Sequence, residues 1–314
     1  MAHVVTLTMN PSIDLSVSLE RVLPFHKLRC AEGRRDPGGG GINVARVMKR
    51  LGADVTAVYA AGGTLGQLLR QLIDNEGIPT SIVVIGGETR EDFTVLEQST
   101  GAQYRFVLPG PHVAEREWRV CLDGLVALDS RTRFIVGSGS LPPGVPEDFY
   151  GRVAQLAKQG SRKIVIDSSG PALRAAVEAG VYLIKPSLNE FRGLTGGDGP
   201  LETQADWIEA CRRLVNRGKV EVVALTLGDR GALLVTGDRV LRAQALAIKP
   251  LSIVGAGDSF LGAMIWSLAA GQAVETAFRY GVAAGSAALL MPGTELCERE
   301  DVERLFKDVR VDVI

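Results

Sequence analysis

The stretch VGAGDSFLGAM, residues 254–264, combines a glycine-rich turn with one carboxylate at the expected start of a helix. Gly255, Ala256 and Gly257 leave backbone N–H groups accessible, and the positive end of a helix dipole favours an anion there. Asp258 adds a negative charge beside this anion site. Two interpretations are open: Asp258 is the N-cap of the helix, or it takes part in a reaction together with the N–H groups.

Phosphoryl transfer is a reaction that uses both features side by side. Backbone N–H groups of residues 255–257 would stabilise the charge on a phosphoryl group in transfer. The Asp258 carboxylate would take the proton from the attacking hydroxyl. Beyond these groups, the reaction needs mainly positioning and a Mg²⁺ ion that neutralises charge. A capping Asp would need no anion site in front of it, so the pattern favours phosphoryl transfer.

A second glycine-rich stretch, DPGGGGINVARVMKRLG (36–52), places four glycines before a helix with Asn43 in its first turn. It is not a dinucleotide fingerprint, because Asn43 stands where the third glycine would be and a polar, proline-containing segment precedes it. The chain also contains no P-loop motif. The stretch is either a flexible turn or a place where backbone approaches the hydroxyls of a ligand closely.

Two further motifs follow predicted strands. SGSLPPG (138–144) places Ser138 and Ser140 at the carboxyl end of a strand, where ligands bind in α/β proteins. LTLGDRGALLV (225–235) has the pattern strand, turn, strand. It is either an ordinary hairpin or backbone wrapped around a nucleotide.

The composition is that of an ordinary globular protein. The chain has 314 residues, a formal net charge of −1 and 23% charged residues, so neither nucleic acid nor a membrane is expected as a partner. Four scattered cysteines and three histidines argue against a zinc site and fit a reducing compartment. The N-terminus lacks a signal-peptide pattern, and the longest apolar run, 280–291, predicts a buried helix. We therefore expect a cytoplasmic protein.

Strand and helix patterns alternate along most of the chain. Strands are predicted at 4–9, 55–60, 133–137, 163–167, 181–185 and 220–227, and helices at 42–51, 65–75, 147–159 and 203–217. This alternation predicts an α/β fold with a mainly parallel sheet and helices on both faces. Ligands would bind beyond the carboxyl ends of the strands.

Two segments depart from this alternation. Residues 14–36 and 87–108 have strand-like patterns without helices, and the second segment folds about Thr100 and Gly101. Either they form a small sheet that projects from the body, or they are separate surface excursions. With the first interpretation, the chain divides into an α/β core of residues 1–13, 37–86 and 109–314 and a lid made of the two segments.

The motifs GGGGINVAR, SGSLPPG and VGAGDSFLGAM resemble the signature regions of the PfkB (ribokinase-like) carbohydrate kinases. The likeness runs from TLTMNPSIDLSV to GVAAGSAALLMPGTELC, which is nearly the whole chain. It implies a ribokinase-like three-layer α/β/α fold with a small β-sheet lid, which in many members also forms the dimer contact. A small sheet with exposed strand edges is consistent with a homodimer.

The resemblance also implies an activity: ATP-dependent phosphorylation of fructose 6-phosphate at C1, giving fructose 1,6-bisphosphate. Phrases such as TGAQYRFVLPG and IDSSGPAL favour this substrate. Asp258 would be the base, and Gly255, Ala256 and Gly257 the anion hole. The implied sugar ligands are Asp14, Gly39, Gly40, Asn43 and Ser140, and the implied phosphate ligands are Arg90 and Arg105, joined by Lys27 and Arg29 from a partner subunit. Alternatively, these four basic residues form a solvated strand face.

For ATP, the implied ligands are Lys185, Ser187, Thr226, Gly228 and Gly231, with Val282 and Ser286 bordering the base. Glu190 would act on Mg²⁺ through water. The family motif N-x-x-E reads SLNE here, so Ser187 stands in the place of Asn and its role with Mg²⁺-ATP is open. A K⁺ loop would use backbone at Ser252, Val254, Ala288 and Gly293, although Ile253 replaces a hydroxyl residue that often stands there.

Other functions remain open at this point. A kinase for fructose 1-phosphate or tagatose 6-phosphate differs only in hydroxyl stereochemistry or in the position of the phosphate. A non-catalytic sensor of sugar phosphates or nucleotides is a candidate from another class, but retention of Asp258 and the anion loop argues against it. An NAD-dependent dehydrogenase is disfavoured by the failed dinucleotide fingerprint.

Overall fold

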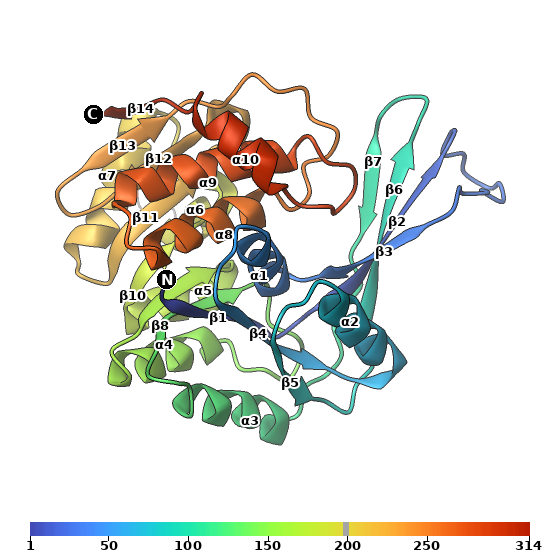
Figure 1. The fold of residues 1–314 in the computed structure, drawn as a ribbon, viewed down its shortest axis with the longest axis horizontal. Coiled ribbons are helices and arrows are strands. Elements are labelled where there is room, and N and C mark those ends of the chain that lie inside the picture. The colour runs from blue at the N-terminus through green and yellow to red at the C-terminus, as the bar shows by residue number, and fades with distance from the viewer. Residues whose placement is uncertain (197–200) are drawn as a thin grey trace.

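The computed structural model describes residues 1–196 and 201–314, which form an α/β body and a smaller sheet that projects from it (Figure 1). The strands of the body are β1 (His3–Thr8), β4 (Val55–Ala61), β5 (Thr80–Val84), β8 (Thr132–Ser138), β9 (Lys163–Asp167), β10 (Val181–Ile184), β11 (Val220–Thr226), β12 (Ala232–Val235), β13 (Val240–Ala243) and β14 (Val311–Val313). Their order in the sheet is β14-β13-β12-β11-β10-β9-β8-β1-β4-β5. The strands from β11 to β5 run parallel, and β12, β13 and β14 continue the sheet antiparallel.

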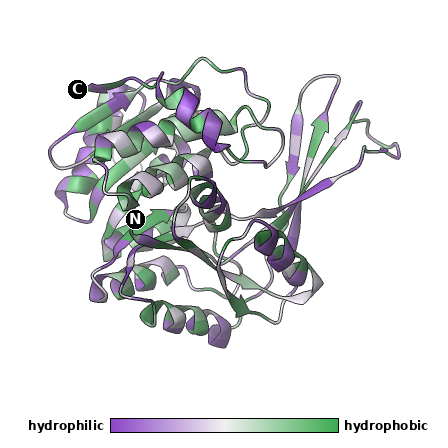
Figure 2. Cartoon of the chain, in the orientation of Figure 1, coloured by the Kyte–Doolittle hydropathy of each residue, from purple (hydrophilic) through white to green (hydrophobic). Residues whose placement is uncertain are grey.

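Helices cover both faces of this sheet. One face carries α1 (Gly40–Arg50), α2 (Gly63–Asn75), α8 (Ala256–Ala269), α9 (Val274–Ala288) and α10 (Arg299–Phe306), and the other α3 (Glu115–Val126), α4 (Phe149–Gln159), α5 (Gly170–Ala179), α6 (Leu188–Thr195) and α7 (Gln204–Asn216). Each face has its own hydrophobic cluster, and consecutive strand residues such as Val4 and Val5 enter different clusters because side chains alternate across a strand. Figure 2 shows the apolar strands between helices whose outer residues are hydrophilic.

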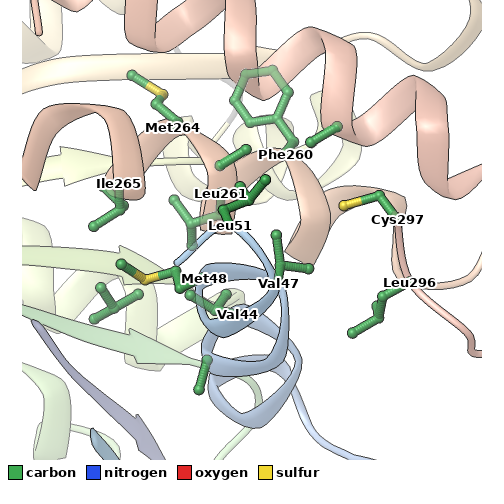
Figure 3. Close-up of a cluster of buried hydrophobic side chains, with 14 of the residues drawn as sticks. Val44, Val47, Met48, Leu51, Phe260, Leu261, Met264, Ile265, Leu296 and Cys297 are labelled. Carbon is green, nitrogen blue, oxygen red and sulfur yellow. The ribbon is translucent and has the colours of Figure 1, made fainter. Parts of the chain in front are cut away.

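Helices α1 and α8 pack tightly against each other, and this contact positions the two functional segments at their N-termini. Val44, Val47 and Met48 of α1 meet apolar residues of α8 in a buried cluster (Figure 3). A Cβ at Gly262 would lie 2.9 Å from Val47, so glycine permits the close approach. The same packing brings the first turn of α1 beside the first turn of α8.

The projecting sheet, called the lid below, consists of β2 (Ser12–Leu19), β3 (Arg34–Gly38), β6 (Arg90–Glu97) and β7 (Gln103–Phe106) in the order β3-β2-β6-β7. Strands β2 and β6 pair in parallel over eight residues, and the outer pairs are antiparallel. The turn between β6 and β7 contains Gly101 with φ 73°. The prediction that the two irregular segments form one small sheet is therefore confirmed.

The predicted strands and helices all occur, with ends within about two residues of the prediction. The apolar run 280–291 is the second half of α9 and the turn after it. Only the ends of segment 14–36 are strands, since residues 20–33 lack regular structure. No helix among the described residues is long and apolar enough to cross a membrane.

Candidate active site

A polar cavity of about 230 Å³ lies at the carboxyl ends of the central parallel strands. It is lined by Gly40, Ser138, Gly139, Ser140, Asp167, Ser168, Ser169, Glu190 and Asp258. These residues come from the ends of β8 and β9, from the segments that follow these strands, and from the first turns of α1, α6 and α8. The cavity therefore lies where α/β sheets bind ligands, as the sequence predicted.

Asp258 is the third residue of α8 and not its N-cap. The helix begins at Ala256, and Gly255, in the left-handed region with φ 77°, occupies the cap position. The Asp258 carboxylate makes no capping hydrogen bond; instead the Asn43 side-chain amide donates to its Oδ2 at 2.9 Å. The N-cap interpretation is thus wrong, and the N–H groups of residues 256–258 have no acceptor within the helix.

The surroundings of Asp258 favour a base. Burial raises the pKa of this carboxyl, the hydrogen bond from Asn43 and the charges of Lys185 and Arg105 lower it, and Asp14 raises it, with a net upward shift. A carboxylate with a raised pKa accepts a proton more readily than one in water. The side chain lines the cavity, so it is accessible to a bound hydroxyl.

The glycines before α1 allow its first turn to approach neighbouring strands. A Cβ at Gly40 would lie 2.2 Å from Ser138 Oγ, and a Cβ at Gly41 would lie 2.7 Å from the Leu7 carbonyl oxygen. Gly39 has φ 107°, which side chains disfavour. The glycine run is therefore a specific close contact with the ends of β8 and β1, rather than a flexible turn.

Asp14 lies in β2, where the lid meets the body. Its Oδ1 accepts a hydrogen bond from the Ser12 hydroxyl at 2.6 Å, and a Cβ at Gly38 would lie only 2.3 Å from the same oxygen. Burial raises the pKa of Asp14, while Ser12 and the two arginines Arg105 and Arg90 lower it, with a net upward shift. This buried carboxylate therefore faces positive charge from the lid.

Of the four predicted phosphate ligands, one is held by backbone carbonyl groups and the other three are exposed. Arg90 is held by the carbonyl oxygens of Leu108, at 2.8 Å, and Asn10, at 3.3 Å. Arg105 is exposed on β7, and its charge acts on both Asp14 and Asp258. Lys27 and Arg29 lie in the exposed connection between β2 and β3, and within the described residues of one chain no acceptor contacts them.

Ser140, another predicted sugar ligand, lines the cavity and accepts a hydrogen bond from the Asn10 side-chain amide at 3.0 Å. Asn10 thereby contacts both Ser140 and, through its carbonyl oxygen, Arg90. The sequence analysis did not include Asn10. Its signal was its place directly after a buried strand.

Lys185 follows β10 and is almost fully buried. Its ammonium forms an ion pair with Asp167 at 3.2 Å. Asp167, at the end of β9, lines the cavity, and burial raises its pKa to about 7 against the charge of Lys185. The sequence analysis missed Asp167, together with Ser168 and Ser169, although a polar run at the carboxyl end of a strand could have indicated them.

Ser187 has a structural role as the N-cap of α6. Its hydroxyl accepts from the Glu190 N–H at 3.3 Å, and the Glu190 carboxylate accepts from the Ser187 N–H at 2.7 Å. This capping box fixes the Glu190 side chain at the cavity wall. Thr226 lies beside Ser187 across an isolated bridge, and its N–H donates to the Pro186 carbonyl oxygen at 3.0 Å.

The remaining predicted ATP ligands lie on two elements. Gly228 opens the 3₁₀ helix η1 (Gly228–Arg230) between β11 and β12, and Gly231 ends this turn with φ 88°. The predicted strand, turn, strand pattern is confirmed. Val282, buried, and Ser286, half-buried, lie on α9, which packs against α8.

The carboxylates at the cavity fit a hydrated Mg²⁺ ion. Glu190, Asp167 and Asp258 offer hard oxygen ligands; burial raises the pKa of Asp167 and of Asp258, and a bound cation would favour their charged forms. Among the described residues no group of three or more metal-ligating side chains gathers. Mg²⁺ commonly binds with few protein ligands, because substrate phosphates and waters supply the others.

The predicted K⁺ loop consists of two segments that lie together. The Ser252 hydroxyl donates to the Gly293 carbonyl oxygen at 2.9 Å and accepts from the Val254 N–H at 3.2 Å. The Ala288 carbonyl oxygen accepts from the Met291 N–H at 3.1 Å. Two of the expected carbonyl ligands thus already accept hydrogen bonds, and each keeps a second lone pair.

Comparison with known proteins supplies the family. An ATP-dependent 6-phosphofructokinase isozyme 2 from Mycobacterium tuberculosis is 44% identical over 97% of this chain and 89% of its own length. A 1-phosphofructokinase from Haloferax volcanii is 34% identical, with 99% and 98% covered. A crystal structure of phosphofructokinase-2 from Escherichia coli in complex with potassium superposes with a TM-score of 0.94 at 38% identity, covering 98% of this chain and 99% of that one.

The structural match confirms the expected ribokinase-like fold. The family model described as "pfkB family carbohydrate kinase" matches residues 4–301. The chain therefore belongs to the pfkB family of carbohydrate kinases and is a phosphotransferase that acts on a sugar hydroxyl.

Proposed function

We propose that the protein transfers the γ-phosphoryl group of ATP to the C1 hydroxyl of fructose 6-phosphate. The observation that carries this proposal is the Asp258 carboxylate beside the unpaired N–H groups at the start of α8, held by Asn43 at a cavity wall. The substrate is supported by the relatives named 6-phosphofructokinase and by a structure of the Escherichia coli protein in complex with fructose-6-phosphate.

In this mechanism Asp258 accepts the proton of the sugar hydroxyl as its oxygen attacks the γ-phosphorus and ADP leaves. Residues 255–257 donate N–H groups to the phosphoryl group in transfer. Asp14, Gly39, Gly40, Asn43 and Ser140 hold the sugar hydroxyls. Glu190 would hold a Mg²⁺ ion through water, with Asp167 nearby, and this ion would neutralise charge on the phosphates. The nucleotide lies across the ligands already given for ATP.

The sugar phosphate is held by Arg90 and Arg105 of the lid, with Lys27 and Arg29 supplied by a second copy of the chain. The lid leaves large apolar side chains exposed, among them Phe25, Phe106 and Val107. Contact with a second lid would cover them, and this supports a homodimer. The Escherichia coli relative also has a tetrameric inhibited form, so assemblies larger than a dimer are compatible with this proposal.

The test is a panel of kcat/KM values for fructose 6-phosphate, fructose 1-phosphate and tagatose 6-phosphate with Mg²⁺-ATP, with and without K⁺. We expect fructose 6-phosphate to be preferred at least tenfold. A preference for fructose 1-phosphate, which the Haloferax volcanii relative makes the second candidate, would reassign the substrate. Binding of ATP and a sugar phosphate without formation of ADP would favour the non-catalytic sensor. If K⁺ binds at the loop of Ser252 and Gly293, kcat should be higher with K⁺ than with Na⁺.

The proposal places the enzyme in the cytoplasm. All four cysteines are free thiols and three of them are buried, which suits a reducing compartment.

A further inference from the structure

The ion pair between Asp167 and Lys185 is a feature of the cavity that the mechanism above leaves unexplained. The two residues end the neighbouring parallel strands β9 and β10, and their charged atoms lie 3.2 Å apart. The exposed fraction is 13% for the Asp167 side chain and 5% for that of Lys185. Asp167 lines the cavity, so one partner of this buried pair borders the reacting groups.

The ammonium of Lys185 lies against the first turn of α8. A Cβ at Gly257 would be 3.3 Å from Lys185 Nζ. This places a positive charge beside the positive end of a helix dipole, in a region with little water. Two positive groups in such a place repel each other. An anion bound next to both of them removes this repulsion and is stabilised by both.

Burial alone would favour the neutral amine of Lys185, yet its pKa is raised. The cause is the opposing effect of three carboxylates, in order Asp167, Glu190 and Asp258. Asp167 is the largest of these contributions and makes the ion-pair contact. The ion-pair contact with Asp167 therefore fixes the Lys185 ammonium next to Gly257.

Stability gives no sufficient reason for such a pair. Well-packed apolar residues in place of a buried ion pair are often equally stable or more stable. The strand residues just before this pair, Val165 and Ile166 of β9 and Leu183 and Ile184 of β10, are apolar and fully buried. The only other charge on the two strands is Lys163, which is exposed at the opposite end of β9, so the shielded charges lie where the strands reach the cavity.

We propose that Asp167 is a positioning residue that holds the Lys185 ammonium against the first turn of α8, where Lys185 binds the phosphoryl group during its transfer. This inference rests on the proposed kinase function and assigns Asp167 a role through Lys185. It differs from a role of Asp167 as a direct ligand of hydrated Mg²⁺. The two roles make different predictions when Lys185 is absent.

The test is a double-mutant cycle on kcat with the variants Asp167→Asn, Lys185→Met and both together. We expect Lys185→Met to lower kcat about 100-fold or more, and Asp167→Asn about 10- to 100-fold, with KM for the sugar phosphate changed less than about threefold. In the Lys185→Met background, Asp167→Asn should change kcat less than about threefold. Lys185→Arg, which keeps the charge, should retain more activity than Lys185→Met.

A second measurement separates catalysis from folding. Lys185→Met should weaken binding of ADP with aluminium fluoride and sugar phosphate far more than binding of ADP alone, because the fluoride complex mimics the phosphoryl group in transfer. Asp148→Asn, which breaks a surface ion pair with Arg152 on α4, is the matched control and should leave both readouts unchanged.

The outcomes are distinct. Multiplicative losses in the double variant, or equal weakening of both ADP complexes by Lys185→Met, would overturn the positioning role while the wild-type kinase activity stands. A wild-type protein without kinase activity on any sugar phosphate would overturn the proposed function and this inference together.

Discussion

The two halves of the candidate site are built differently. In the body, the groups placed at the reacting centre already contact one another: Asn43 binds Asp258, Lys185 binds Asp167, and Glu190 binds the N–H of Ser187. On the lid, Arg105, Lys27 and Arg29 are exposed. The body is therefore organised before substrates arrive, whereas much of the lid's positive charge awaits an anion or a second chain.

The comparison assigns rate to the body and affinity for the sugar phosphate to the lid. Mutations in the body should lower kcat, and mutations in the lid should raise KM. Four measurements test this division, from the largest expected effect to the smallest.

The largest effect is expected from Asp258→Asn. Asparagine keeps the shape but cannot accept the proton, so kcat should fall about 10²- to 10⁴-fold while the Kd for ATP stays within about threefold. Steady-state kinetics and nucleotide titration measure the two. Glu275→Gln, which changes a carboxylate in the first turn of α9, is the control. Near-normal kcat in Asp258→Asn would remove the base from the mechanism.

Arg105→Ala should raise KM for the sugar phosphate about 10- to 100-fold and leave KM for ATP nearly unchanged. The reason is the loss of a charge that faces Asp14 and Asp258 from the lid. Arg131→Ala, an exposed arginine at the opposite end of β8, serves as the control. Equal effects on both KM values would place Arg105 outside the sugar subsite.

Mixed dimers test whether Lys27 and Arg29 act across subunits. One parent carries Asp258→Asn, and the other carries Lys27→Ala with Arg29→Ala. In a heterodimer, the second parent's site keeps Asp258 and receives the intact lid loop of the first, so activity up to about half of the wild-type value should return. No gain over the separate parents would mean that the loop serves its own chain or no site.

The smallest effect concerns stability and pH. Asp167 has a pKa of about 7 in the folded chain against an ordinary value of 3.8. A raised carboxyl pKa gives stability that is complete below the unfolded pKa and is lost as pH rises through the folded one. Stability of the ligand-free protein should therefore fall between about pH 4 and 7, and less steeply in Asp167→Asn, by a few degrees of Tm. The same dependence of Tm on pH in the two proteins would contradict this.

The sequence predicted the parallel body well, because its β-branched runs and amphipathic helices have regular periods. The family resemblance implied roles at the active site for Asp258, Gly40, Ser140 and Glu190, and these four residues line one cavity. Asp167 was missed although it opens a polar run at the carboxyl end of a strand, because such a run occurs in ordinary turns as well as in binding sites. Its importance arises from contact with Lys185, which depends on the order of the strands.

The sequence also did not reveal which charged residues are buried. Arg46 lies in the middle of α1, and it is 1% exposed, paired with Glu76 at 2.7 Å and bonded to the Pro37 carbonyl oxygen. Only the fold brings these partners together. Ser187 is different: it stands where the family motif has Asn, and its capping box with Glu190 is a local S-x-x-E pattern that the sequence analysis did not use.

The lid is a direct continuation of the central sheet's own backbone. Three residues, Met9, Asn10 and Pro11, separate β1 from β2, all three are buried, and the proline ring fixes one of the backbone angles. The eight paired residues of β2 and β6 then extend about 26 Å. Such a strand pair acts as a stiff lever arm, so a small tilt at the β1–β2 connection becomes a large displacement at the far end of the lid. Contacts made at that far end are transmitted back to the connection in the same way.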